Sequence, residues 1–189
     1  MIRTICLTAL LLTLGGPASA HPEHEASGFL HPFTGIDHLL AMVAVGIWAA
    51  FLAVRKRATA LLVPATFLAM MAVGAAAVFA GIKLPLVEAI ILGSVFVFGG
   101  LSLNEVRLPA AAAMSVAGLF AFFHGYAHAL EAPEAGAGAY IWGFLAATTL
   151  LQAVGLGLGW AALRVLGDLG LRALGGAVLA GGAFVLIAQ

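Results

Sequence analysis

Six apolar runs, each close to the length of a membrane-spanning helix, follow one another along this chain. They occupy residues 35–54, 60–80, 86–103, 110–130, 140–163 and 174–188. About 20 apolar residues cross the hydrocarbon core of a bilayer as a helix, and the third and sixth runs are slightly shorter than that. Only 8% of the residues are charged, whereas soluble domains usually carry about 25%. The runs therefore predict an all-α integral membrane protein with six transmembrane helices.

Short segments connect the six runs and leave no room between them for a soluble domain. These segments read RKR, GIKLP, NEVRLP, EAPEAGAGA and RVLGDLGLR. We therefore expect residues 21–189 to form a single six-helix transmembrane domain. The six spans can be divided into two halves of three. Because three is an odd number, the first and fourth spans cross the membrane in opposite directions, which permits two halves of inverted topology, as in many secondary transporters.

The first 20 residues have the composition of a secretory signal peptide. Arg3 supplies a positive start, ICLTALLLTL is apolar but too short to span, and ASA at residues 18–20 is a small-residue cleavage site. We expect cleavage after Ala20, so that the mature chain begins at His21; an uncleaved first helix is the alternative. Cys6 is the only cysteine and lies within this segment. A metal site in the mature chain must then use nitrogen or oxygen ligands, or methionine sulfur.

The basic residues between the runs are divided unequally between the two sides of the membrane. If the mature N-terminus is outside, the inner side holds six basic residues and the outer side only Lys83. The six are Arg55, Lys56, Arg57, Arg107, Arg164 and Arg172. The positive-inside rule then predicts that both termini lie on the outer side, which is the periplasm for the bacterial inner membrane in which we expect the protein. A cleaved secretory signal gives the same orientation.

The formal net charge of +0 excludes one class of partner. Nucleic-acid-binding domains present a strongly basic surface, which this chain lacks. The partners that the sequence predicts are the lipid bilayer and a small cationic substrate, and a homo-oligomer is compatible with it.

All six histidines fall in two short stretches, and the predicted topology places both stretches at the outer face. They are His21, His24, His31 and His38 around the start of the first run, and His124 and His128 near the end of the fourth. His124, His128 and Glu131 are spaced i, i+4 and i+7, so on a helix they share one stripe within about 60°. Two imidazoles one turn apart can chelate a divalent transition metal. A hydrogen-bonded polar seam is the alternative, although ionisable side chains inside a membrane usually mark a functional site.

The stretch HPFTGIDHLLAM adds candidate ligands at the start of the first run. Asp37 and His38 are adjacent, so on a regular helix they point about 100° apart. Asp37 can ligate beside His38 or orient it, as carboxylates often do for ligand histidines. Its alternative role is that of a helix-start acid. Pro32 and Gly35 favour an irregular start, which would let His31 fold back over the helix.

Three further residues are weaker candidates for metal ligands. His21 would offer its α-amine and its imidazole at the mature N-terminus, with His24 close by, and this tail either collects metal or is simply solvated. Glu88 follows Pro85 by three positions, as an acid does in the first turn of a helix. It also lies at the outer face, where a cation would pass.

Small residues four positions apart predict where helices pack closely. Gly155 and Gly159 form one such pair. Gly125 and Ala129 form another, on a face of the fourth helix turned away from its histidines. We expect both faces to contact a neighbouring helix. Gln152, in the middle of the fifth run, is expected to hydrogen-bond between helices.

The two histidine stretches together resemble the signatures of a known family. HPFTGIDHLLAM and FHGYAHALE are similar to the two motifs of the HupE/UreJ family of nickel and cobalt permeases. The resemblance extends over the apolar runs and basic loops, and it departs at Ala129, where the family usually has glycine. It implies secondary transport of Ni²⁺ or Co²⁺. The polar positions that match, and that it implies as the metal site, are His31, Asp37, His38, His124, His128 and Glu131.

We therefore expect a permease rather than an enzyme, with a divalent metal ion as its substrate and no prosthetic group. Nitrogen and oxygen ligands suit nickel, cobalt and zinc alike. No G-x-x-x-x-G-K-[ST] motif is present, so the sequence gives no sign of an ATPase. An intramembrane zinc hydrolase is the alternative, because an H-x-x-x-H pair with another histidine and an aspartate can also hold a catalytic zinc. Against it, HGYAH lacks the glutamate of H-E-x-x-H.

Overall fold

The computed structural model describes residues 28–133 and 136–188. Within these ranges, a short 3₁₀ turn is followed by six α-helices, and there is no strand. The elements are η1 (His31–Phe33), α2 (Ile36–Ala53), α3 (Thr59–Phe79), α4 (Val87–Leu103), α5 (Ala110–Leu130), α6 (Ala137–Leu166) and α7 (Asp168–Ala188). Five helices are long and apolar enough to span a membrane, and α4 is apolar but shorter, at 17 residues. The predicted all-α, multi-pass membrane class is confirmed.

Two predictions fall on residues that the structure does not describe. The signal peptide at residues 1–20 is one of them. The histidine tail, with His21 and His24, is the other. Both stay predictions from the sequence.

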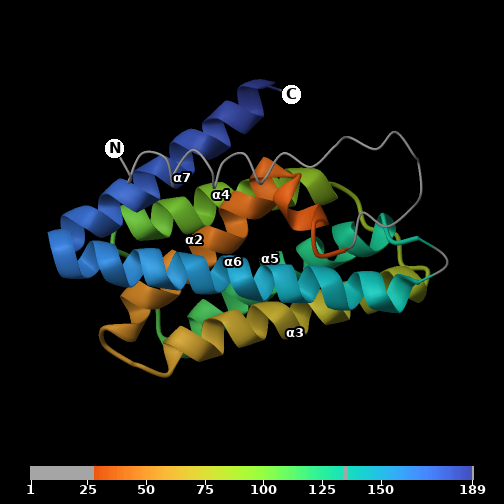
Figure 1. Cartoon of the computed structure of the whole chain (residues 1–189), viewed down its shortest axis with the longest axis horizontal. Helices are drawn as coiled ribbons and strands as arrows, with labels where there is room; N and C mark the ends of the chain where they lie inside the picture. Colours follow the sequence, from red (N-terminus) through yellow and green to blue (C-terminus); the bar gives the residue numbers. More distant parts are fainter. Residues whose placement is uncertain (1–27, 134–135, 189) are drawn as a thin grey trace, which may run out of the picture.

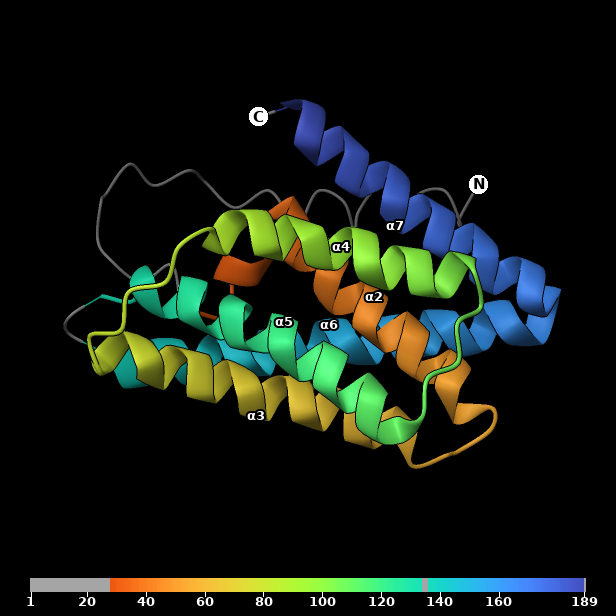
Figure 2. The same cartoon turned by 180° about the vertical axis from the view of Figure 1, so that it is seen from behind.

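The six helices form three layers of two (Figure 1). α4 and α7 make one outer layer and α3 and α5 the other, with α2 and α6 between them, as the reverse view in Figure 2 also shows. α2 is the central helix, because almost every residue from Ala41 to Ala53 is buried. Its Trp48 is fully buried and donates a hydrogen bond from Nε1 to the Val106 carbonyl, 3.0 Å away. The two helices of the middle layer therefore pack against helices of both outer layers.

The helix boundaries agree with the apolar runs to within three residues, except between α6 and α7. The predicted loop RVLGDLGLR is wrong, because α6 continues to Leu166 and α7 begins at Asp168. Only Gly167 separates them, at φ +60°, a backbone conformation that favours glycine. Asp168 then supplies an acid to the first turn of α7. Hydropathy does not reveal this join, since a helix can continue through polar residues once it leaves the hydrocarbon.

Glycines let α3 and α5 meet backbone to backbone. A Cβ atom at Gly125 would collide with the backbone of Met71, and one at Gly74 would collide with the backbone of Phe122. Ala129 is buried on the same face of α5. The prediction that Gly125 and Ala129 mark a face packed on a neighbouring helix is confirmed.

The middle layer uses the same device. A Cβ atom at Gly155 would collide with the backbone of Val43, and one at Gly159 would press on Ile47 and Ala50, so α6 meets α2 along this face. The predicted packing of the Gly155 and Gly159 pair is thus confirmed. Close backbone contact of this kind holds the start of α2 and the end of α5 at fixed positions within the bundle.

Candidate metal-binding site

An interrupted helix start builds the first half of the site. Pro32 lies in the η1 turn, and the Thr34 hydroxyl donates a hydrogen bond to the His31 carbonyl at 2.7 Å. Gly35 is extended, with φ −93° and ψ 112°, and separates this turn from α2. The turn brings the His31 ring to 5.8 Å from that of Tyr140, on α6. His31 therefore folds back beside the helix start, as the sequence predicted.

The last turns of α5 provide the second half. His124 and His128 are 0% and 1% exposed. Nδ1 of His124 lies 2.9 Å from the Phe120 carbonyl oxygen. Because a carbonyl only accepts hydrogen bonds, Nδ1 carries the proton and Nε2 of the neutral ring carries the lone pair. His124 can thus bind a cation through Nε2.

The two halves bring four imidazole rings together. The centroid of the His128 ring lies 5.1 Å from that of His31 and 4.7 Å from that of His38. The centroids of His38 and His124 are 5.3 Å apart. The two histidine stretches, far apart in the sequence, therefore meet at one place in the fold.

A carboxylate contacts each of the two outer histidines. Oδ1 of Asp37 lies 3.0 Å from Nδ1 of His38 and accepts a hydrogen bond from the His38 backbone N–H. This geometry favours the orienting role among those that the sequence left open for Asp37. Oε2 of Glu131 lies 2.5 Å from Nε2 of His31. Glu131 thus contacts the cluster through His31, on the η1 turn.

Exposure falls from the surface carboxylate to the deepest imidazoles. The side chain of Glu131 is 57% exposed and that of His31 is 26% exposed. The side chain of His38 is 12% exposed, and His128 and His124 are buried. A cation arriving from water would therefore meet ligands of decreasing exposure.

Three ring nitrogens in the buried part of the cluster have no hydrogen-bond partner. They are Nε2 of His124 and both nitrogens of His128. Burying one unpaired polar atom costs about 1–3 kcal/mol, so such atoms are rare in folded proteins. Their gathering beside two further imidazoles makes this cluster the candidate site for a cation.

The side chains do not yet form a coordination shell. Among the described residues, no three His, Cys, Asp or Glu side chains are arranged to hold one ion. Nδ1 of His38 faces Asp37, and Nε2 of His31 faces Glu131. Three-fold coordination of one ion therefore requires at least one side chain of the cluster to turn.

Glu88 lies apart from these contacts. It is exposed in the first turn of α4. Within the part of the chain that the structure describes, no hydrogen bond or ion pair joins it to the four imidazoles. Its position is that of a helix-start acid.

Aromatic walls of the site were missed by the sequence analysis. Phe144 stacks on the ring of His128 at a centroid distance of 5.0 Å, and Phe67 lies 5.5 Å from the ring of His124. These rings pack against the buried imidazoles. In the sequence they resemble any other apolar residue of a span. The spacing of Tyr140 and Phe144, one turn apart, was the only available sign of a shared face.

Polar atoms continue inward from the histidines along the contact between α2 and α6. The Thr148 hydroxyl donates a hydrogen bond to the sulfur of Met42 at 3.3 Å. One turn deeper, Gly46 lies against the backbone of Gln152. The Gln152 side chain is buried, and neither its amide nitrogen nor its oxygen has a partner among the described residues. The predicted interhelical hydrogen bond of Gln152 is therefore wrong.

Comparison with known proteins covers both halves of the site. The family model described as HupE / UreJ protein matches residues 8–185. Protein HupE of Rhizobium leguminosarum bv. viciae is 40% identical over an alignment of 188 residues, and the match covers 97% of this chain and 97% of that protein. No solved structure matches the chain.

Proposed function

The chain belongs to the HupE/UreJ family, and from this premise we propose that it is a secondary transporter of a divalent transition-metal ion, Ni²⁺ or Co²⁺. The membrane it crosses is the bacterial inner membrane. One observation carries the proposal: the unpartnered ring nitrogens of the buried His124 and His128 lie within a group of four histidines inside a multi-pass bundle. The resemblance found in the sequence supplies the identity of the metal.

The proposed ligands are the imidazoles of His31, His38, His124 and His128. Neutral imidazole nitrogen suits nickel, cobalt and zinc. Asp37 orients His38 through Nδ1, which leaves Nε2 of that ring for the ion. Glu131 is the most exposed member and would receive the hydrated cation first.

The ion would advance by exchanging ligands. Binding at His31 releases this ring from Glu131, and a small rotation then brings it toward His128, whose ring centroid is 5.1 Å away. The ring of His38 follows, 4.7 Å from that of His128, and then the fully buried ring of His124, 5.3 Å from that of His38. A membrane potential of about 100 mV contributes about 4.6 kcal/mol to the movement of a doubly charged ion across the whole bilayer.

The zinc hydrolase receives no support from the family match. Its motif also lacks a general base inside HGYAH, and Asp37 is already paired with His38. We therefore propose binding and release of the ion, without a catalytic step.

Uptake of radioactive nickel into cells tests the proposal. We expect His124→Ala, His38→Ala and Asp37→Asn to lower uptake by roughly 10–100-fold at equal protein abundance in the membrane. Asp168→Asn is the matched control, because it removes an exposed carboxylate from the first turn of another helix. An excess of cobalt should compete with nickel more strongly than an excess of zinc does. Wild-type uptake by His124→Ala and His38→Ala would remove this site from the transport path.

A further inference from the structure

The end of the bundle opposite the histidines carries a cavity lined by three cations. Arg55, Lys56 and Arg107 line this cavity of about 310 Å³, where the end of α2 meets the start of α5. Thr59 and apolar residues complete the wall, and no carboxylate lines it. Within residues 28–133 and 136–188, none of the three cations forms an ion pair. Three uncompensated positive charges therefore face one small space.

Both loops that supply these cations are held in place. The Thr59 hydroxyl donates a hydrogen bond to the Lys56 carbonyl at 2.7 Å. Trp48 donates one to the carbonyl of Val106, next to Arg107. The guanidinium of Arg107 lies 4.1 Å from the centre of the Phe51 ring, a cation–π contact. The backbone at Lys56 and Val106 and the guanidinium of Arg107 are thus held at the cavity, whereas Arg55 and Lys56 are exposed.

An apolar groove continues directly from this cavity. Lys56 and Ala110 line both the cavity and a groove of about 620 Å³ between α3 and α5. The rest of the groove is lined mainly by apolar side chains, with two hydroxyls: Leu62, Thr66, Met70, Met114, Ser115 and Leu119. The groove is formed by two helices that are predicted to span the membrane. A positive cavity that opens onto an apolar groove matches the shape and chemistry of a phospholipid.

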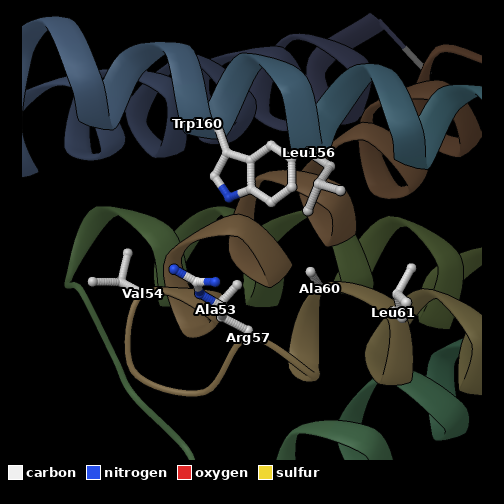
Figure 3. Close-up of a pocket in the computed structure, with 7 residues that line it drawn as sticks. All are labelled: Ala53, Val54, Arg57, Ala60, Leu61, Leu156 and Trp160. Atoms are coloured by element: carbon white, nitrogen blue, oxygen red, sulfur yellow. The ribbon is translucent and has the colours of Figure 1, made fainter.

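A neighbouring groove provides an internal comparison. It is lined by Arg57 and Trp160 together with apolar residues, and Figure 3 shows that the side chains come from both sides of the loop after α2 and from α6. This groove is of similar size, about 530 Å³, but only one cation lines it. Arg57 therefore lies in the same loop as Lys56 and carries the same charge, but it does not line the cavity of Arg55, Lys56 and Arg107.

We propose that the cavity of Arg55, Lys56 and Arg107 binds the phosphate of an anionic phospholipid, with one acyl chain in the groove between α3 and α5. Three cations favour a headgroup with net negative charge. They disfavour a zwitterionic headgroup, whose amine would be repelled. Basic pockets between transmembrane helices bind anionic headgroups in this way. The proposal does not rest on the transport of metal.

Native mass spectrometry of the purified full-length protein tests the proposal. The probes are phosphatidylglycerol and phosphatidylethanolamine with identical acyl chains. We expect wild-type protein to retain the anionic lipid preferentially. Lys56→Gln/Arg107→Gln should lower its retention by roughly 30-fold, while Arg57→Gln should retain it as wild type does.

Two further measurements separate a lipid from a free anion and from a diffuse charge effect. Ser115→Trp should fill the groove and lower lipid retention while leaving all cations in place. Millimolar inorganic phosphate should fail to displace the lipid. Equal retention of the two lipids, equal losses in Arg57→Gln and Lys56→Gln/Arg107→Gln, or full displacement by phosphate would each overturn the proposal. If the double variant does not reach the membrane, Ser115→Trp and the phosphate competition still decide it.

Discussion

Several buried polar atoms have no hydrogen-bond partner among the described residues, and each such atom costs stability, about 1–3 kcal/mol. They include ring nitrogens of His124 and His128 and the side-chain amide of Gln152. The first two belong to the proposed metal site. Gln152 lies deeper along α6, one turn beyond the contact of Thr148 with the sulfur of Met42. On α2, the path from His38 to Gly46, which faces Gln152, covers about 12 Å.

We predict that Gln152→Leu slows nickel uptake without lowering stability. Leucine removes both unpaired polar atoms, which is neutral or favourable for folding, but it also removes oxygen from the inward path. Uptake is measured per protein in the membrane, and the thermal midpoint is measured in detergent. Thr149→Val is the control, since the Thr149 hydroxyl is exposed and only bonds to its own helix.

The opposite results for Gln152→Leu would contradict a role of Gln152 in ion transport. Full uptake together with a lower thermal midpoint would mean that Gln152 serves the packing of α2 on α6. The residue would then have no part in the path of the ion.

The element that decides the position of the buried histidines is the α3–α5 pair. Gly125 lies next to His124 in the sequence, and a Cβ atom at Gly125 would collide with the backbone of Met71 on α3. One helix thus carries the imidazoles of the proposed site on one face and a close backbone contact on another. A side chain at Gly125 would therefore shift the helix, and the imidazoles with it.

We predict that Gly125→Ala lowers both thermal stability and nickel uptake. Its Cβ would collide with backbone that cannot move alone, and such overpacking costs about 1–3 kcal/mol. Gly157→Ala is the matched control, because a Cβ there meets nothing within 4 Å. Thermal unfolding followed by circular dichroism and uptake per membrane protein check both. If Gly125→Ala and Gly157→Ala behave alike, the close approach of α3 and α5 does not position the ligands.

The whole molecule has two chemically different ends. The histidine cluster occupies one end, and the cations of the lipid cavity occupy the other. This polarity has the sense of the positive-inside rule if the histidines face the periplasm. The orientation, the cleaved signal, the homo-oligomer and the two inverted halves stay predictions.

Labelling of single cysteines tests the orientation. Cys6 is the only native cysteine, so its replacement by serine gives a background free of thiols. We predict that Ile82→Cys, at an exposed position beyond α3, reacts with a membrane-impermeant maleimide on intact spheroplasts. Ala58→Cys, exposed at the basic end, should react only after permeabilisation. The reverse pattern would invert the molecule in the membrane and place the proposed lipid cavity in the outer leaflet.

Much of the architecture could be predicted from the sequence, because its causes are local. The thickness of the hydrocarbon sets the length of every span, and the backbone must hydrogen-bond to itself there, so apolar runs become helices of known extent. The spacing of His124 and His128 gives a shared stripe by helical geometry alone. For the same reason Gly125 and Ala129 could be identified as a packing face.

The tertiary structure decided what depends on which helices meet. Apolar residues in different spans look alike, so no local property pairs α3 with α5 or α2 with α6; many weak packing contacts decide this together. That choice sets Phe144 against His128, joins Glu131 to His31, and leaves Gln152 without the partner that its sequence position suggested. It also brings Arg55 and Arg107 to one cavity. The sequence by itself determined the helices and the candidate ligands, whereas their partners are properties of the assembled bundle, since each contact joins residues that the sequence does not relate.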